Sequence, residues 1–93
     1  MIASFASRKT ERLWQRRRDH GLPPTIERVA LRKLTQLHRS RELRDLRLPP
    51  GNRLESLLSD RAGQHSIRIN DQWRLCFRWQ GEDAYNVEIV DYH

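Results

Sequence analysis

The second half of the chain alternates between apolar and polar residues with the period of two that is typical of β-strands. The pattern predicts one strand over about 65–70, a second over 73–79 and a third over about 85–90. Residues 80–84 contain a glycine and predict a hairpin loop, so the second and third strands pair antiparallel. The second strand is therefore the central strand of a predicted antiparallel sheet.

The apolar rows of the first two strands determine how these strands pair. With residues 70–72 as the loop, Ile67 lies opposite Leu75, and the apolar side chains of both strands share one face. The same register places Arg68 directly opposite Arg74 on the other, solvent-side face. Like charges in such a cross-strand pair repel by roughly 0.2–1 kcal/mol unless an anion lies between them. The register therefore predicts a position that can bind an anion such as a phosphate.

The third strand brings a tyrosine toward this pair of arginines. Matching Trp79 to Tyr85 places Arg74 opposite Val90, with Tyr92 on the same face one diagonal step away. Two arginines and a tyrosine then converge over three strands. The same pattern also fits a solvated sheet face of mixed charge, and it does not decide between the two interpretations.

The first half of the chain carries helical signals. Residues 2–5 predict a short strand, and Ser7 is placed to cap a helix that runs to about His20. Gly21 is placed for a left-handed stop directly after this helix.

A second helix is predicted from Ile26, with Thr25 as its N-cap. Its apolar residues recur at helical spacing and form one stripe, whereas Leu31 lies off the stripe and is expected at the surface. Residues 43–46 predict one further short turn, and a Pro-Gly step within 49–52 suits a type II turn. The apolar stripe consists of Ile26, Val29, Ala30, Leu34 and Leu37.

Helices followed by an antiparallel meander predict an α+β fold, with two helices packed on one face of the sheet. The 93 residues are expected to form one small domain over 1–93, because a chain of this length leaves no room for a second core.

Arginine dominates the charge of the chain. Lysine and arginine together number 18 against 12 acidic residues, and 16 of these 18 cations are arginine. The planar guanidinium suits phosphate, so a nucleic acid is the first partner to consider. Most of the excess lies in the first half, where Arg16, Arg17 and Arg18 follow Arg12 on the first predicted helix. This run is either a contact to a polyanion or a solvated helix face.

Other classes of site have little support in the sequence. Cys76 is the single cysteine, which excludes an intrachain disulfide and favours a reducing cytoplasm. We expect no membrane or export function, since the chain shows no signal-peptide pattern and no run near the ~20 apolar residues of a bilayer span. The histidines lack metal-ligand spacing and there is no Gly-rich phosphate loop, so neither a metal nor a cofactor is expected.

Two segments closely resemble the HigB branch of the RelE-like toxins, particularly its GraT-like members. Residues 51–79 include the Ser-Ile-Arg of 66–68 and the Trp-Arg of 73–74, and residues 87–93 end in Asp-Tyr-His. Residues 1–5 and the two helices look similar as well, so the resemblance covers nearly the whole chain. It implies a RelE-like fold and a metal-independent endoribonuclease, the toxin of a type II toxin–antitoxin pair, which enters the ribosome and cuts translated mRNA.

The resemblance also implies partners and site residues. The partners would be mRNA, ribosomal RNA at the decoding site and a helix-turn-helix antitoxin, with operator DNA bound only through the antitoxin. Arg68 and Arg74 match family arginines at the cleavage site. Asp91, Tyr92 and His93 match the C-terminal signature, and Tyr92 is the expected proton-transfer residue. The products would be a 2′,3′-cyclic phosphate and a 5′-hydroxyl.

The chain departs from the better-known HigB pattern at two positions. That pattern has a histidine and a lysine where this chain has Glu55 and Leu58. Glu55 is either a base at the site or an ordinary surface carboxylate, and Arg53 or Arg61 is expected to supply the missing positive charge.

Two other classes of function fit the sequence. One is a nucleic-acid-binding module without catalysis that uses the basic helices, although the sequence shows no recognition helix. The other is an inactive family member that only binds its antitoxin. Mapping of mRNA 5′ ends after induced expression distinguishes both from an active toxin.

Overall fold

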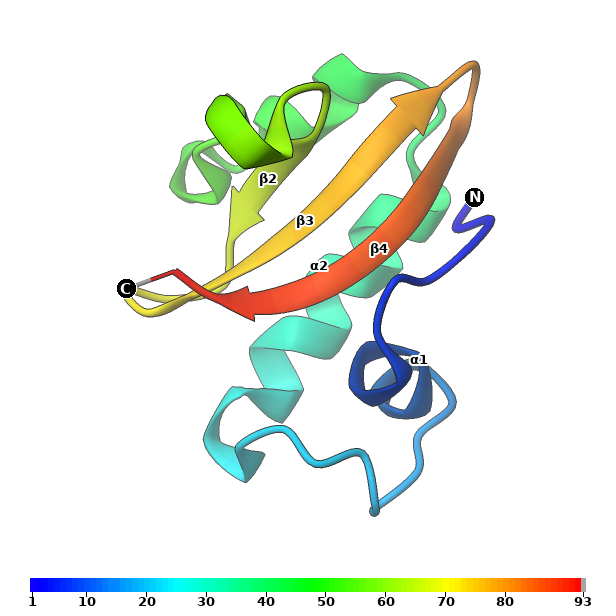
Figure 1. Ribbon diagram of the computed structural model, residues 1–93, viewed down its shortest axis with the longest axis vertical. Helices are drawn as coiled ribbons and strands as arrows, with labels where there is room; N and C mark the ends of the chain where they lie inside the picture. Colours follow the sequence, from blue (N-terminus) through cyan, green and yellow to red (C-terminus); the bar gives the residue numbers. More distant parts are fainter. Residues whose placement is uncertain (93) are drawn as a thin grey trace.

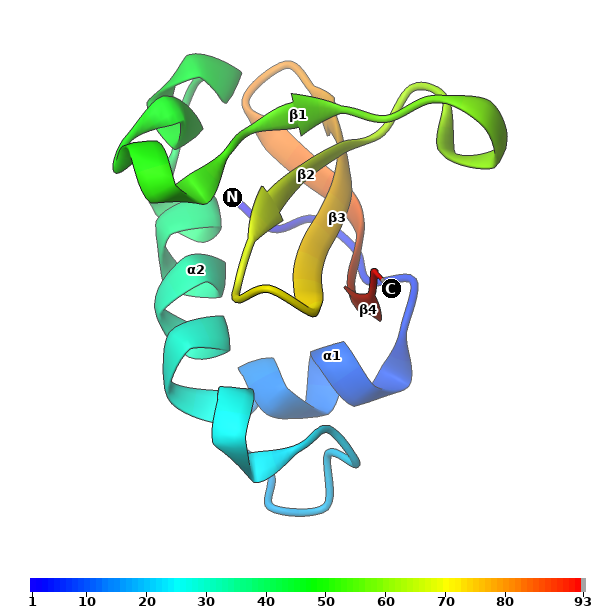
Figure 2. The same ribbon diagram turned by 90° about the vertical axis from the view of Figure 1, so that its left-hand side faces the viewer.

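The computed structural model describes residues 1–92, and within them the chain forms a four-stranded antiparallel sheet in the order β1-β2-β3-β4 (Figures 1 and 2). The strands are β1 (Glu55–Ser56), β2 (His65–Arg68), β3 (Trp73–Gln80) and β4 (Asp83–Asp91). The three predicted strands are confirmed as β2, β3 and β4. The short edge strand β1 was not predicted, because two residues are too few to show alternation.

The predicted register between β2 and β3 is confirmed, with Ile67 opposite Leu75 and Arg68 opposite Arg74. The register between β3 and β4 is confirmed near Arg74, which lies opposite Val90.

The far end of the β3–β4 pair differs from the prediction. Trp79 lies opposite Ala84 rather than Tyr85, because the register shifts between Cys76 and Arg78. Asn86 in β4 has a left-handed backbone with φ of 53°, which accommodates the extra residue of a bulge. The hairpin loop is also shorter than the predicted 80–84, since β3 ends at Gln80 and β4 begins at Asp83.

Helix α1 (Arg8–Trp14) begins as predicted and ends early. The Ser7 hydroxyl accepts a hydrogen bond from the Thr10 amide at 3.3 Å, so Ser7 is the N-cap. The predicted end near His20 is wrong, because Arg16 takes a left-handed conformation with φ of 64° and closes the helix after Trp14. Gly21 also has a positive φ, of 85°, but it lies in the loop beyond.

Helix α2 (Glu27–Arg39) follows a 3-10 turn at Pro24–Ile26. The predicted N-cap is wrong, because Thr25 lies inside this turn and its side chain makes no cap hydrogen bond. The apolar stripe of α2 is confirmed, with Ile26 and Leu34 among its buried members. The prediction that Leu31 lies at the surface is wrong, because Leu31 is partly buried and packs against the core.

Two 3-10 turns connect α2 to β1. The predicted short turn is confirmed at Leu43–Arg47. The predicted type II turn is wrong, because Pro50–Asn52 forms a second 3-10 turn and the positive φ falls on Arg53 instead of Gly51.

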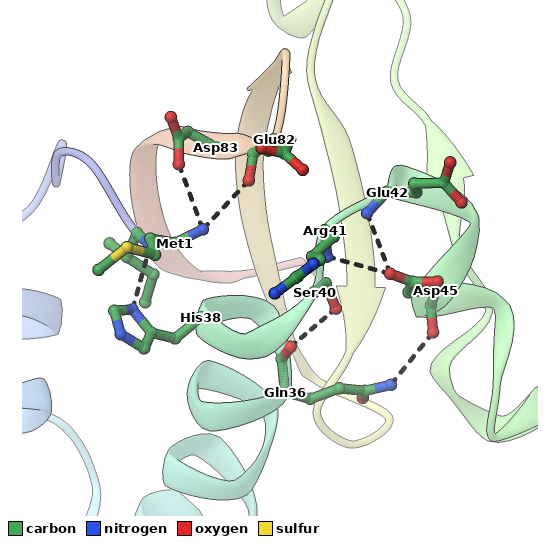
Figure 3. Close-up of polar contacts among 10 residues, drawn as sticks. Met1, Gln36, His38, Ser40, Arg41, Glu42, Asp45, Glu82 and Asp83 are labelled. Atoms are coloured by element: carbon green, nitrogen blue, oxygen red, sulfur yellow. Dashed lines mark hydrogen bonds and ion pairs between the residues drawn. The ribbon is translucent and has the colours of Figure 1, made fainter.

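The N-terminal segment runs beside β4 as two parallel bridges, Ile2 with Ala84 and Phe5 with Val87, rather than as the predicted strand. Its amino group donates to the carbonyl of Glu82 at 3.1 Å and lies 3.3 Å from the Asp83 carboxylate (Figure 3). The segment is thereby tied to the start of β4.

The core lies between the helices and one face of the sheet. Figure 2 shows α2 on one side of the sheet and the β1–β2 connection on the other. The fold is therefore the predicted α+β arrangement of two helices on one face of an antiparallel sheet. Within residues 1–92, none of the helices combines the length and the apolar character needed to cross a membrane. The fully buried core residues include Ala30, Leu34, Leu37, Ile67, Leu75, Phe77 and Val87.

Candidate functional site

The face of the sheet that points away from the helices is polar and covered. Side chains alternate along a strand, so Ser66, Arg74 and Cys76 lie on this face while their neighbours face the core. The connection from β1 to β2 folds over it, which buries Leu57. As a result Arg74 is only 8% exposed. Arg74 therefore lies on the predicted face of the sheet, but the expectation that this position is exposed to solvent is wrong.

The guanidinium of Arg74 is held in a defined orientation. Its Nε donates to the Ser66 hydroxyl at 2.8 Å, and its Nη2 donates to the backbone carbonyl of Arg53 at 2.7 Å. The carboxylate of Glu55 lies 3.9 Å from the same Nη2. The Arg74 Cζ also lies 5.5 Å from the centre of the Tyr92 ring. These contacts leave the cation buried, oriented and next to a phenol.

Tyr92 lies directly after β4. Its amide donates to the carbonyl of Gln72 at 2.7 Å, and the residue is 48% exposed. The ring therefore covers part of Arg74 and stays open to a ligand. Glu55 on β1, at 52% side-chain exposure, lies beside the same guanidinium.

The other two residues of the C-terminal signature do not join this group. Asp91 lies opposite Trp73 and so belongs to the other face of the sheet. Its carboxylate accepts a hydrogen bond from Gln72 Nε2 at 2.9 Å. His93 lies outside the described residues.

Arg68 lies opposite Arg74 but has a different environment. Its guanidinium contacts the carboxylate of Asp71 in the β2–β3 loop, and its side chain is 34% exposed. The ammonium group of Lys33 in α2 has a lowered pKa, mainly because it is buried and also because of the positive charges of Arg32 and Arg68. Like charges thus crowd this end of the sheet, and each of the paired arginines has a carboxylate beside it.

Arg61 comes to the same face from the β1–β2 connection. It donates to Glu88 of β4 at 2.8 Å and to Gln64 at 3.1 Å. The hydrogen bond to Glu88 raises the pKa of the Arg61 guanidinium, and interactions with Cys76 and Tyr92 act in the same direction. Because Glu88 lies opposite Cys76 in the sheet, Arg61 lies on the same face as Cys76. Burial raises the pKa of the Cys76 thiol, which keeps the thiol protonated.

The basic run of the first half lies elsewhere. Arg16 and Arg17 follow α1 rather than forming a helix face, which corrects the prediction. Arg16 donates to the Trp14 carbonyl at 2.7 Å, and Arg17 makes two hydrogen bonds to Asp19, at 2.7 and 2.9 Å. These bonds lower the pKa of the Asp19 carboxyl. Arg18 is exposed, and Arg12 is partly buried in α1.

The structure therefore brings together Arg53, Glu55, Arg61, Arg74 and Tyr92, with Arg68 opposite Arg74 in register. It does not place the basic run at this group, because α1 packs on the helical side of the sheet. Sequence reasoning missed Ser66 and Gln72. The predicted register could have identified Ser66, because alternation along the strands places it on the same face as Arg74. Gln72 could not be identified in this way, because it contacts Tyr92 through its backbone carbonyl, which any residue has.

Such a group suits the chemistry of a phosphodiester. Oriented guanidinium groups stabilise negative charge that develops on phosphate oxygens, and a phenol exchanges a proton.

The sequence places this chain in a class of toxins. The family model described as RelE-like toxin of type II toxin–antitoxin system HigB matches residues 3–93. The chain therefore belongs to the HigB-like family of RelE-like toxins.

Individual relatives agree with this family. The chain is 39% identical to Toxin HigB-1 of Vibrio cholerae serotype O1 over 90 residues, and this match covers 96% of this chain and 95% of that protein. It is 30% identical over 94 residues to Endoribonuclease HigB of Proteus vulgaris, with both chains covered completely. The fold is similar to the crystal structure of YafQ from E. coli strain BL21(DE3), with a TM-score of 0.58 at 13% identity over 99% of this chain and 94% of that one.

Proposed function

We propose that this protein is the toxin of a type II toxin–antitoxin pair and that it cleaves mRNA on the ribosome at the group around Arg74. The observation that carries the proposal is the guanidinium of Arg74, buried and fixed between Ser66 and the Arg53 carbonyl with Tyr92 against it. The name of the Proteus vulgaris relative supports the choice of an endoribonuclease.

The reaction uses the substrate's own 2′-hydroxyl as nucleophile. The 2′-oxygen attacks the adjacent phosphorus while the bond from phosphorus to the 5′-oxygen breaks. The 2′-hydroxyl gives its proton to a base, and the departing 5′-oxygen takes a proton from an acid. The products are a 2′,3′-cyclic phosphate and a 5′-hydroxyl. In this proposal Tyr92 and His93 exchange these two protons, and Glu55 is a further candidate base beside Arg74.

The arginines stabilise the charge. Arg74 contacts a non-bridging oxygen from its fixed position, and Arg68 exchanges Asp71 for the phosphate when RNA binds. Charge-assisted hydrogen bonds of this kind strengthen as charge builds up in the transition state. Arg53 and Arg61 add positive charge along the same face. Asp91 acts indirectly, through Gln72, which holds the backbone of Tyr92.

The partners follow from the family. A type II toxin is paired with an antitoxin, which we propose contains a helix-turn-helix domain and carries any contact to operator DNA. Ribosomal RNA is the proposed contact of the basic first half, where Arg12, Arg16, Arg17 and Arg18 bind phosphates mostly without sequence preference. The proposed location is the cytoplasm, where translated mRNA is found.

The test is induced expression in growing bacteria with mapping of mRNA 5′ ends. Wild-type protein is expected to produce cuts within translated frames, whereas unchanged transcripts would favour a binding module or an inactive relative. Arg74→Ala is expected to lower cleavage by about 100- to 1000-fold, the usual cost of removing one preorganised donor.

Arg78→Ala is the matched control, because it removes one arginine from the same face of the same strand without touching the site. Arg74→Ala leaves Ser66 and the Arg53 carbonyl without their donor, which costs roughly 1–3 kcal/mol of stability, so a melting curve must show that the variant is folded. Arg74→Lys keeps the charge and supplies a second test: cleavage at the wild-type rate by a folded Arg74→Ala or Arg74→Lys would contradict the proposed site.

A further inference from the structure

A buried asparagine connects α2 to the turn before β1. Asn52 is completely buried, and its Nδ2 lies within hydrogen-bond distance of the carbonyls of Leu46 (3.1 Å) and Leu48 (3.3 Å) and of Gln36 Oε1 (2.9 Å). Its Oδ1 accepts a hydrogen bond from the ammonium group of Lys33. A buried polar network in which each member is bonded is rigid and specifies one arrangement of the backbone around it.

The next residue has an unusual backbone conformation. Arg53 has φ of 46° and ψ of 58°, in the left-handed region that residues with a Cβ rarely adopt. Its amide donates to the Pro50 carbonyl at 3.1 Å, and its own carbonyl accepts the hydrogen bond from Arg74 Nη2 at 2.7 Å. The direction of this carbonyl depends on the left-handed conformation, because an extended or right-handed residue would turn it elsewhere.

We propose that Asn52 is a positioning residue for cleavage: it holds the left-handed turn at Arg53, whose carbonyl holds the guanidinium of Arg74. Lys33 of α2 holds the Asn52 side chain in turn. The inference rests on the proposed function and adds two residues to it that do not touch the RNA.

The geometry favours positioning over a purely structural role. The Arg74 guanidinium is a rigid plane with two fixed points inside the protein, Nε on Ser66 and Nη2 on the Arg53 carbonyl. Loss of the second point lets the plane rotate about the first. A misplacement of about 1 Å costs roughly a hundredfold in rate when the group acts on the transition state.

A matched pair of substitutions at Arg53 tests the carbonyl. Arg53→Gly and Arg53→Val remove the same side-chain charge, but glycine adopts a positive φ freely and β-branched valine resists it. Under single-turnover conditions with saturating programmed ribosomes, we expect the Val variant to cleave at least about tenfold more slowly than the Gly variant, with equal ribosome affinity. Equal rates for the two folded variants would overturn the inference.

A double-mutant cycle tests Asn52 itself. Asn52→Ala is expected to slow cleavage by roughly tenfold to a hundredfold in the wild-type background, and to have little further effect in Arg74→Lys, because the group that it positions is gone. Additive effects would show that Asn52 acts on stability alone and would overturn the inference.

If Asn52→Ala does not fold at the assay temperature, Lys33→Gln and Lys33→Met replace it in the cycle. Glutamine keeps a donor for the Asn52 oxygen and methionine does not, so the Gln variant is expected to cleave faster, and equal rates would overturn the inference. Failure of the proposed function is distinct: it would appear as undiminished cleavage by Arg74→Ala, whereas failure of this inference leaves the Arg74 effect intact.

Discussion

Both faces of the sheet contain buried side chains, but apolar packing surrounds them on one face and directional polar contacts surround them on the other. On the helical face, Leu75 and Phe77 of β3 are fully buried among apolar side chains, and their contacts do not depend on direction. On the other face, Arg74 of the same strand is almost as buried, but it is surrounded by a hydroxyl, a carbonyl and a carboxylate at defined positions.

This difference between the two faces means that, within β3, the apolar residues contribute mainly to stability and Arg74 contributes mainly to function. Burial of an apolar side chain contributes about 1.5–3 kcal/mol to stability. Burial of a guanidinium costs free energy that its hydrogen bonds only offset, so a buried, oriented arginine adds precision rather than stability. We therefore expect substitutions of buried residues on the helical face to destabilise the protein, and substitutions at the group around Arg74 on the polar face to slow the reaction.

The largest expected effect on the polar face is that of Tyr92→Phe. Phenylalanine keeps the ring beside Arg74 and removes the hydroxyl, so RNA binding is expected to survive and proton transfer to fail. General acid–base catalysis contributes roughly 10²–10⁴-fold, and single-turnover cleavage on programmed ribosomes is expected to fall on that scale. Tyr85→Phe makes the same change elsewhere on β4 and serves as the control. A wild-type rate for Tyr92→Phe would assign the proton to His93, Glu55 or water.

On the helical face, Phe77→Ala is expected to lower the free energy of unfolding by about 3–5 kcal/mol. The phenyl ring is fully buried, and its loss leaves a cavity between the sheet and the helices. Urea unfolding curves measure the change. Cys76→Ala alters the adjacent, equally buried residue of the other face and is expected to cost less, since it removes a smaller group. An equal loss for both would remove the contrast between the faces.

The contrast also shows how much of the fold followed from the sequence. The period of two and the apolar rows were enough to predict three strands and to place Arg68 opposite Arg74, because a slip by one residue would expose the core. The early end of α1 was not predictable, since an arginine in the left-handed conformation leaves no sequence signal. The bulge at Asn86 had a weak signal, because asparagine adopts that conformation more readily than most residues.

The candidate site was predictable only in part. Register places Arg74 and Tyr92 on one face, and the structure has them in contact. The burial of Arg74 was not predictable, because it depends on residues 53–64 folding back over the sheet, and a long-range contact of this kind has no local pattern. The roles of Asn52 and Lys33 depend on the same long-range packing.

A smaller effect is expected away from both faces, at the basic run after α1. Reversal of Arg16, Arg17 and Arg18 to Glu is expected to weaken ribosome association and to flatten its salt dependence by about 0.7–0.9 in the log–log slope for each phosphate that the protein no longer neutralises. The single-turnover rate at saturation should not change. The same reversal at Arg39, Arg41 and Arg44 controls for net charge. An unchanged slope would identify the run as a solvated surface.

The smallest effect concerns acid sensitivity on the helical face. His65 of β2 packs beside Phe77 with ring centres 6.0 Å apart, and burial lowers the pKa of its imidazole below the ordinary value of about 6.5. The unfolded chain therefore binds the proton more tightly, and stability is complete above about pH 6.5 and declines as the pH falls toward the folded-state pKa. His65→Gln removes the titrating imidazole. When the pH is lowered from 7.5 to 5.5, the melting temperature of this variant is therefore expected to fall less than that of the wild type. The Tyr92→Phe variant retains His65 and should follow the wild-type curve, because the titrating group belongs to the helical face. If His65→Gln and the wild type lose the same number of degrees on acidification, the acid sensitivity of the helical face lies in other residues.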